Sequence, residues 1–129
     1  MPKIHKVSRD INGISVEQRQ TDGFINATAM CVAHGRKIDA WFRTQDTLEL
    51  FQALANDKEI NYSDLSNSDP ARLSATKYSK IFKGLLLVKG GSPVNGGGVW
   101  LHPDLAIQLA QWCNKIFALQ VSRWVQEWM

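Results

Sequence analysis

The first half of the chain changes from alternating to helical spacing of its apolar residues. Residues 4–20 hold two short stretches with β-branched side chains, separated by an Asn-Gly dipeptide that favours the positive dihedrals of a hairpin turn. Over residues 26–56 apolar positions recur at near-helical spacing, with Asn26 as the N-cap of a first helix and Asp39 as the N-cap of a second. The pattern predicts a β-hairpin over 4–20 and a helix pair over 26–56.

The second half begins with a polar stretch and returns to apolar patterning. Residues 57–70 are rich in Asn, Asp and Ser, which is typical of a surface loop. Two strand-like runs within residues 85–101 flank a glycine-rich tip at 90–98, and they predict a second hairpin. After Pro103, a favourable first helical residue, apolar side chains recur at helical spacing. We expect a second helix pair over 103–128.

These elements predict an α+β fold made of short β-hairpins and two pairs of α-helices. A chain of 129 residues has room for one compact domain. A helix pair followed by a glycine-rich hairpin is the plan of a winged helix-turn-helix, in which the hairpin is the wing. The nine residues at 90–98 include five glycines and one proline, so the composition predicts a tip without a unique conformation in the free protein.

Positive charge is concentrated in one segment of the chain. Residues 71–103 carry five basic side chains and no acidic one, whereas the remainder holds ten basic and twelve acidic residues. Such a block attracts polyanions and makes nucleic acid a candidate partner. A solvated lysine face is the ordinary alternative.

Several classes of protein are disfavoured by composition. The longest apolar runs fall far short of the roughly 20 residues that cross a bilayer, and residues 1–5 lack the apolar stretch of a secretory signal. We therefore expect an intracellular protein with no membrane partner. Cys31 and Cys113 are the only cysteines and lie in no Cys/His cluster, so we expect reduced, buried thiols, with no metal site and no cofactor.

Three motifs could indicate an enzyme. Cys31 and His34 are neighbours on one predicted helix, but no third orienting group is evident. His102 and Asp104 could form a dyad, yet His-Pro-Asp at a helix start is better explained by helix entry. The glycine-rich stretch lacks the Gly-Lys-Ser/Thr ending of a phosphate-binding loop. We expect no enzymatic activity.

The C-terminal helices carry aromatic side chains that allow another function. Trp124 and Trp128 could cover a partner in a protein-interaction module, although core packing explains their spacing. This interaction module is the alternative to nucleic-acid binding.

Five separated segments carry a pattern shared with a known family: Asp-Gly-Phe-Ile-Asn-Ala-Thr at 22–28, Gly-Arg-Lys at 35–37, Trp-Phe-Arg at 41–43, Val-Trp-Leu-His-Pro-Asp-Leu-Ala at 99–106 and Leu-Ala-Gln-Trp at 109–112. These segments resemble the KilA-N domain, which occurs in phages and large DNA viruses and is similar to the fungal APSES DNA-binding domain. The resemblance implies a winged-helix-like DNA-binding fold, often joined to a different C-terminal domain. The family commonly has Gly-Thr-Trp where this chain has Gly98-Val99-Trp100, and the tip lacks the glutamines of some APSES relatives.

The resemblance also implies positions for DNA contacts. The expected partner is double-stranded DNA, bound by the DNA-binding module of a phage or viral regulatory protein, with an additional C-terminal domain or a homodimer partner. The expected location is the cytoplasm of a bacterial host or a DNA-containing compartment. Of the other motif residues, Asn26 is read as a cap, and Trp41, Trp100 and Trp112 as core. By motif position, the expected contacts are Arg36, Lys37, Arg43 and Gln45 at the start and exposed face of the recognition helix, and Lys89, Ser92 and Asn95 on the wing. The charge of the basic segment, rather than the resemblance, adds Lys80 and Lys83 to the expected contacts.

Overall fold

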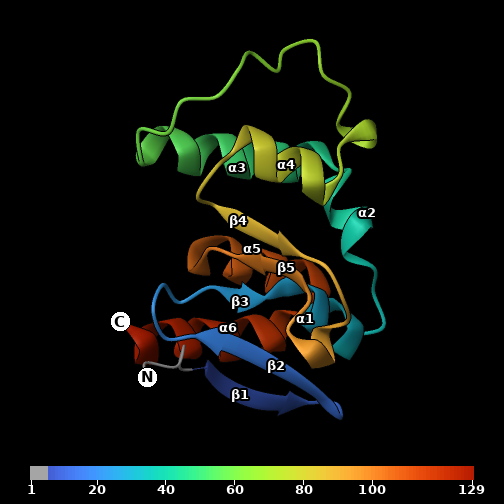
Figure 1. Ribbon diagram of the computed structural model, residues 1–129, viewed down its shortest axis with the longest axis vertical. Helices are drawn as coiled ribbons and strands as arrows, with labels where there is room; N and C mark the ends of the chain where they lie inside the picture. The colour runs from blue at the N-terminus through green and yellow to red at the C-terminus, as the bar shows by residue number, and fades with distance from the viewer. Residues whose placement is uncertain (1–5) are drawn as a thin grey trace.

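A computed structural model describes residues 6–129 and shows one five-stranded antiparallel sheet with helices packed around it (Figure 1). The strand order is β1-β2-β3-β5-β4, so the last two strands of the chain extend the sheet beyond β3. This architecture confirms the predicted α+β class. The strands are β1 (Lys6–Ile11), β2 (Ile14–Arg19), β3 (Ile25–Asn26), β4 (Leu86–Lys89) and β5 (Gly98–Leu101).

The first hairpin turns at the Asn-Gly dipeptide. Asn12 and Gly13 both have positive φ, at 53° and 84°, and the Gly13 amide donates to Asp10 Oδ1 at 2.8 Å. The Asn12 side chain donates to the Ala33 carbonyl at 2.9 Å, which ties this turn to the first helix. Residues 4 and 5 of the predicted hairpin lie outside the described residues.

Three helices cover one face of the sheet, and the other face is turned toward the viewer in Figure 1. They are α1 (Ala27–Ala33), α5 (Pro103–Cys113) and α6 (Lys115–Trp128). Side chains alternate across each strand, so Val16, Ile25 and Leu101 point to these helices and are buried. The outer face of the sheet is formed by the side chains that point the opposite way, including those of Lys6 and Trp100.

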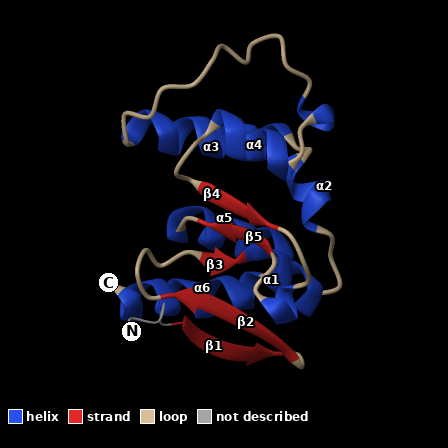
Figure 2. Ribbon diagram, in the orientation of Figure 1, coloured by secondary structure: helices blue, strands red, loops and turns tan. Residues whose placement is uncertain are grey.

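Three further helices form a second layer beyond β4 (Figure 2). They are α2 (Ile38–Phe42), α3 (Gln45–Asp57) and α4 (Ala75–Ile81). Aromatic rings join them: Tyr78 of α4 lies 4.9 Å from Phe42 and 4.6 Å from Phe51, between ring centroids. These rings are fully buried and extend the core away from the sheet.

The prediction of one helix opening at Asp39 is wrong. The first helical turn instead starts at Ile38 and stops at Phe42, and a new helix starts at Gln45. Thr44 causes the second start, since its side chain accepts from the Thr47 amide and so caps α3. Helix α4 was absent from the predicted organisation, because seven residues after a polar loop give little periodicity to detect.

Candidate nucleic-acid interface

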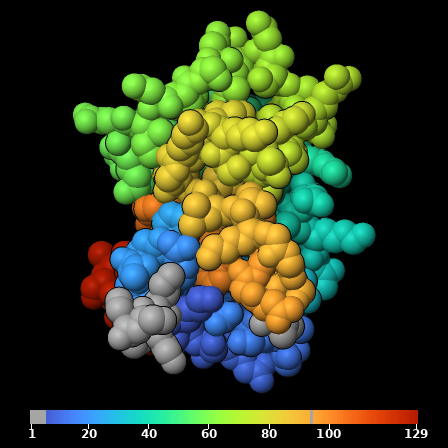
Figure 3. Space-filling model, in the orientation of Figure 1, coloured from blue at the N-terminus to red at the C-terminus, as the bar shows by residue number. Residues whose placement is uncertain are grey.

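The basic segment lies on α4 and the strand that follows it. Lys77, Lys80, Lys83 and Lys89 are all exposed, and among residues 6–129 none of the four forms an ion pair with a carboxylate. Lys83 occupies the turn from α4 into β4, and Lys89 is the last residue of β4. Figure 3 shows α4 and the tip after β4 on the same face of the molecule. The segment is therefore a strip of unneutralised positive charge.

Negative charge is gathered elsewhere. Residues 45–69, which form α3 and the loop after it, hold six acidic side chains and one basic one. The loop after α3 projects from the end of the molecule that is farthest from β1 and β2 (Figure 1). The chain thus separates its charges between a basic strip and an acidic end.

The glycine-rich tip is held by hydrogen bonds that its composition did not predict. The Ser92 carbonyl accepts from the amides of Asn95 and Gly97 at 3.0 and 2.8 Å, and Pro93–Asn95 form a short 3-10 turn. The Asn26 amide group donates to the Gly97 carbonyl at 3.0 Å. The tip therefore folds back onto the sheet, because partners outside it satisfy its backbone groups.

Trp100 lies beneath this tip with no exposed surface, as its reading as a core residue predicted. Its indole Nε1 donates to the Gly96 carbonyl at 3.1 Å. The ammonium groups of Lys6 and Lys89 lie 5.3 and 6.0 Å from its ring centroid. Lys6 was not among the predicted contacts. No motif near Lys6 in the sequence marks it as a contact, because Lys6 and Lys89 come together only when β1 folds beside the tip.

The four residues expected at the start and on the exposed face of one recognition helix lie instead at the ends of α1, α2 and α3 and in the connections between them. Arg36 and Lys37 follow α1, Arg43 ends α2, and Gln45 begins α3. All four side chains are exposed. The Arg36 guanidinium lies 4.4 Å from the ring centroid of Trp112, so it stacks against α5. Arg36 and Lys37 precede α2, and the break between α2 and α3 separates Arg43 from Gln45, so these side chains do not share one helical face.

The two predicted tip residues contact each other. Asn95 Nδ2 donates to Ser92 Oγ at 3.3 Å, and both side chains are exposed. Their positions leave them accessible to a ligand that lies across the tip.

The two histidine motifs have structural roles. His102 Nδ1 accepts the Asp104 amide at 3.1 Å and caps α5, as the helix-entry interpretation predicted. Burial lowers the pKa of His102, which favours the neutral ring that this cap needs. The His34 ring lies 4.4 Å from that of Phe117, while the Cys31 sulfur contacts Cys113.

The C-terminal aromatic rings are used inside the domain. Trp124 is 7% exposed and packs edge-on against Phe117 at 5.6 Å between centroids. Trp128 Nε1 donates to the Gln20 carbonyl at 2.8 Å, and its ring lies directly over Gly23. These contacts do not favour the alternative in which the two tryptophans cover a partner.

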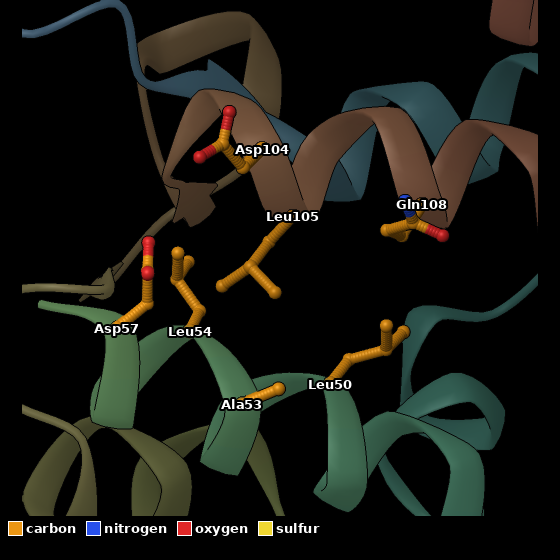
Figure 4. A pocket seen from close by; sticks show the side chains of 7 residues that line it. All are labelled: Leu50, Ala53, Leu54, Asp57, Asp104, Leu105 and Gln108. Atoms are coloured by element: carbon orange, nitrogen blue, oxygen red, sulfur yellow. The ribbon is translucent and has the colours of Figure 1, made fainter.

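One groove differs in character from the basic strip. A cavity of about 350 Å³ separates α3 from α5, with Asp57 and Asp104 at one end (Figure 4). Its lining residues are Leu50, Ala53, Leu54, Asp57, Asp104, Leu105 and Gln108.

Among residues 6–129, no group of three or more His, Cys, Asp or Glu side chains is arranged to hold a metal ion. Within the same residues, no helix combines the length and apolar character needed to span a bilayer.

The fold and the basic strip describe a small α+β domain with a candidate polyanion surface, and the comparisons with known proteins assign its family. The model of the KilA-N domain matches residues 9–129, so the chain belongs to the KilA-N domain family. No solved structure matches the chain.

The similar curated proteins are viral. KilA-N domain-containing protein L4 of Acanthamoeba polyphaga mimivirus is 29% identical over 83% of this chain and 19% of its own length. KilA-N domain-containing protein L33 of the same virus is 25% identical over 83% of this chain and 38% of its own length. Fowlpox virus protein FPV248 is 22% identical over 90% of this chain and 66% of its own length. The chain therefore spans about a fifth of the length of the first relative, and these relatives lend no support to the expected bacterial host.

Proposed function

We propose that this domain binds double-stranded DNA as the DNA-binding module of a viral regulatory protein. The observation that carries the proposal is the strip of exposed lysines without carboxylate partners, on the same face as the glycine-rich tip. Membership of the KilA-N family supports it, through the likeness of that family to APSES DNA-binding domains. An additional domain or a homodimer partner stays a prediction.

The strip suits a phosphate backbone. Lysine side chains at Lys80, Lys83 and Lys89 supply mobile positive charge, and DNA releases condensed counterions when such charges replace them. The acidic loop after α3, which is distant along the helix from Gln45, would be repelled by phosphates, so it favours the opposite end of the molecule for the approach of the duplex. In this proposal the tip acts as a wing, and Arg43 and Gln45 read base edges.

The test is an affinity titration against random duplex DNA, single-stranded DNA and RNA at two salt concentrations. If about four phosphates are neutralised, the slope of log affinity against log salt for duplex DNA is near −3.6, from about −0.9 per phosphate. Duplex DNA should bind most tightly. No binding to duplex DNA at about 50 mM salt, with the protein folded, rejects the proposal.

A double variant, Lys83→Ala with Lys89→Ala, tests the position of the surface. We expect weaker binding to every duplex and a shallower salt slope, because two phosphate contacts are lost. The matched control is Lys58→Ala with Lys115→Ala, which removes the same charge from exposed positions outside the strip. Equal losses from the two double variants would mean that net charge alone governs binding.

Arg43→Ala and Gln45→Ala test whether bases are read. Loss of a base contact changes the ranking of duplex sequences, whereas loss of a phosphate contact weakens all of them alike. A uniform loss in these variants and in the lysine variant would leave phosphate contacts only and would remove the base-reading role.

A further inference from the structure

The two cysteines of the chain meet although 82 residues separate them. Cys31 lies in the last turn of α1, and Cys113 is the last residue of α5. Their sulfur atoms are 3.9 Å apart, and both thiols are free. Cys31 is 1% exposed, whereas Cys113 is half-buried and so can be reached by a small solute. Cys113 is thus the more accessible residue of the pair, and the buried Cys31 sulfur lies 3.9 Å from its sulfur.

The surroundings distinguish the two sulfurs chemically. A hydrogen bond from Cys31 lowers the pKa of the Cys113 thiol, and the positive charge of Arg36 lowers it further, against the effect of burial. The same hydrogen bond raises the pKa of Cys31, and burial adds to this. Cys113 is therefore the thiol of the pair that loses its proton more readily, and Cys31 is the thiol that keeps its proton.

A disulfide between these positions requires only a short movement. Its S–S bond is about 2.05 Å long, so the sulfurs must approach by about 2 Å. Both residues lie at helix ends, next to the connections that follow α1 and α5. Arg36 holds one of these connections against α5, since its backbone amide donates to the Cys31 carbonyl at 2.9 Å while its side chain stacks on Trp112.

We propose that Cys113 and Cys31 form an oxidation site at which a hydroperoxide converts the thiol pair into an intramolecular disulfide between α1 and α5. The Cys113 thiolate attacks a peroxide oxygen, the O–O bond breaks, and Cys113 becomes a sulfenic acid with release of hydroxide or alkoxide. Once Cys113 is no longer a thiolate, its hydrogen bond and its charge cease to raise the pKa of Cys31, and only burial still raises it. The Cys31 sulfur then attacks Cys113, forming the S–S bond and releasing water. Two electrons pass from the thiol pair to the peroxide.

The disulfide would fix the end of α1 and the start of the α1–α2 connection, which carries Arg36 and Lys37, to α5. It would also close a long loop and so restrict the unfolded chain. We expect the oxidised protein to melt roughly 10 °C higher than the reduced protein. This inference does not depend on DNA binding.

The test treats the folded, reduced protein with a small excess of hydrogen peroxide. Mass spectrometry should show loss of two hydrogen atoms, proteolytic mapping should give a linked Cys31–Cys113 peptide pair, and dithiothreitol should restore the reduced mass and melting temperature. Cys31→Ala should stop at the sulfenic acid of Cys113, which dimedone traps, and Cys113→Ser should resist oxidation at the same peroxide concentration.

Three outcomes overturn the proposal. The first is the absence of a linked peptide in the wild-type protein, and the second is the formation of cross-links only between two molecules. The third is a reversed order of reactivity, in which dimedone labels Cys31 of the Cys113→Ser variant faster than it labels Cys113 of the Cys31→Ala variant. The first two are read from the wild-type protein, so they hold even if a variant does not fold.

Discussion

The side chain of Asn26 joins the start of α1 to the carbonyl of Gly97, which lies 71 residues further along the chain. Asn26 Oδ1 accepts from the Ala29 amide at 3.1 Å and so caps α1, while its Nδ2 donates to Gly97 at 3.0 Å. The buried side-chain amide of Asn26 therefore bonds to both α1 and the tip, because an Asn side chain carries both an acceptor and a donor. The helix under the sheet and the tip above it depend on the same residue.

Asn26→Ala should destabilise the protein by about 2–4 kcal/mol, because it removes a helix cap and leaves a buried carbonyl unpaired. The matched control is Asn114→Ala at the start of α6, where the oxygen of an exposed side chain accepts from the Ile116 and Phe117 amides of that helix alone. We expect about 1 kcal/mol there. Urea unfolding of both variants measures the difference, and equal losses would show that the contact with Gly97 adds nothing.

Gly97→Ala should disrupt the tip. A Cβ atom at this position would lie 2.2 Å from the Gly91 carbonyl oxygen and 2.6 Å from that of Gly90, and these backbone atoms cannot move without opening the tip. We expect a loss of about 1–3 kcal/mol in the free energy of unfolding. Gly90→Ala is the control, since nothing lies within 4 Å of its added Cβ. If both variants unfold at the same urea concentration, the tip is not packed as described.

Trp100→Phe should loosen the tip without emptying the core. The substitution keeps most of the ring but removes the hydrogen bond from Nε1 to the Gly96 carbonyl, at a cost of about 1–2 kcal/mol. Hydrogen exchange of the tip amides should become faster while that of the β1–β2 hairpin stays unchanged. Unchanged exchange at Gly96 and Gly97 would contradict the role given to this bond.

Stability should fall as the pH drops below about 6.5, the ordinary pKa of histidine. Burial lowers the pKa of His102 in the folded state, so the unfolded chain binds a proton first and the contribution of the neutral cap is lost as the pH falls through the lowered pKa. His102→Asn keeps an acceptor for the Asp104 amide but does not titrate. Melting temperatures from pH 7.5 to 5 should therefore fall less steeply in this variant; an equal slope would place the effect on another group.

Much of the local structure could be predicted from neighbouring residues. The turn at Asn12 and Gly13, the cap at Asn26 and the start of α5 at Pro103 each depend on side chains within a few positions. The charge imbalance of residues 71–103 is also visible in the chain, whereas DNA contacts at its lysines stay a prediction. These features are short-range or compositional, so the sequence alone determined them.

Tertiary structure decided how these parts meet. The tip looked unconstrained because its glycines have no local preference, yet Asn26 and Trp100 supply the bonds that fold it. The strand order brings Lys6 to the same ring as Lys89, and the packing of α1 on α5 brings Cys31 to Cys113. Each of these relationships joins residues that are distant along the chain, and their energies depend on burial and on a specific order of strands and helices. No spacing within the chain encodes that order, which is why only the folded protein shows it.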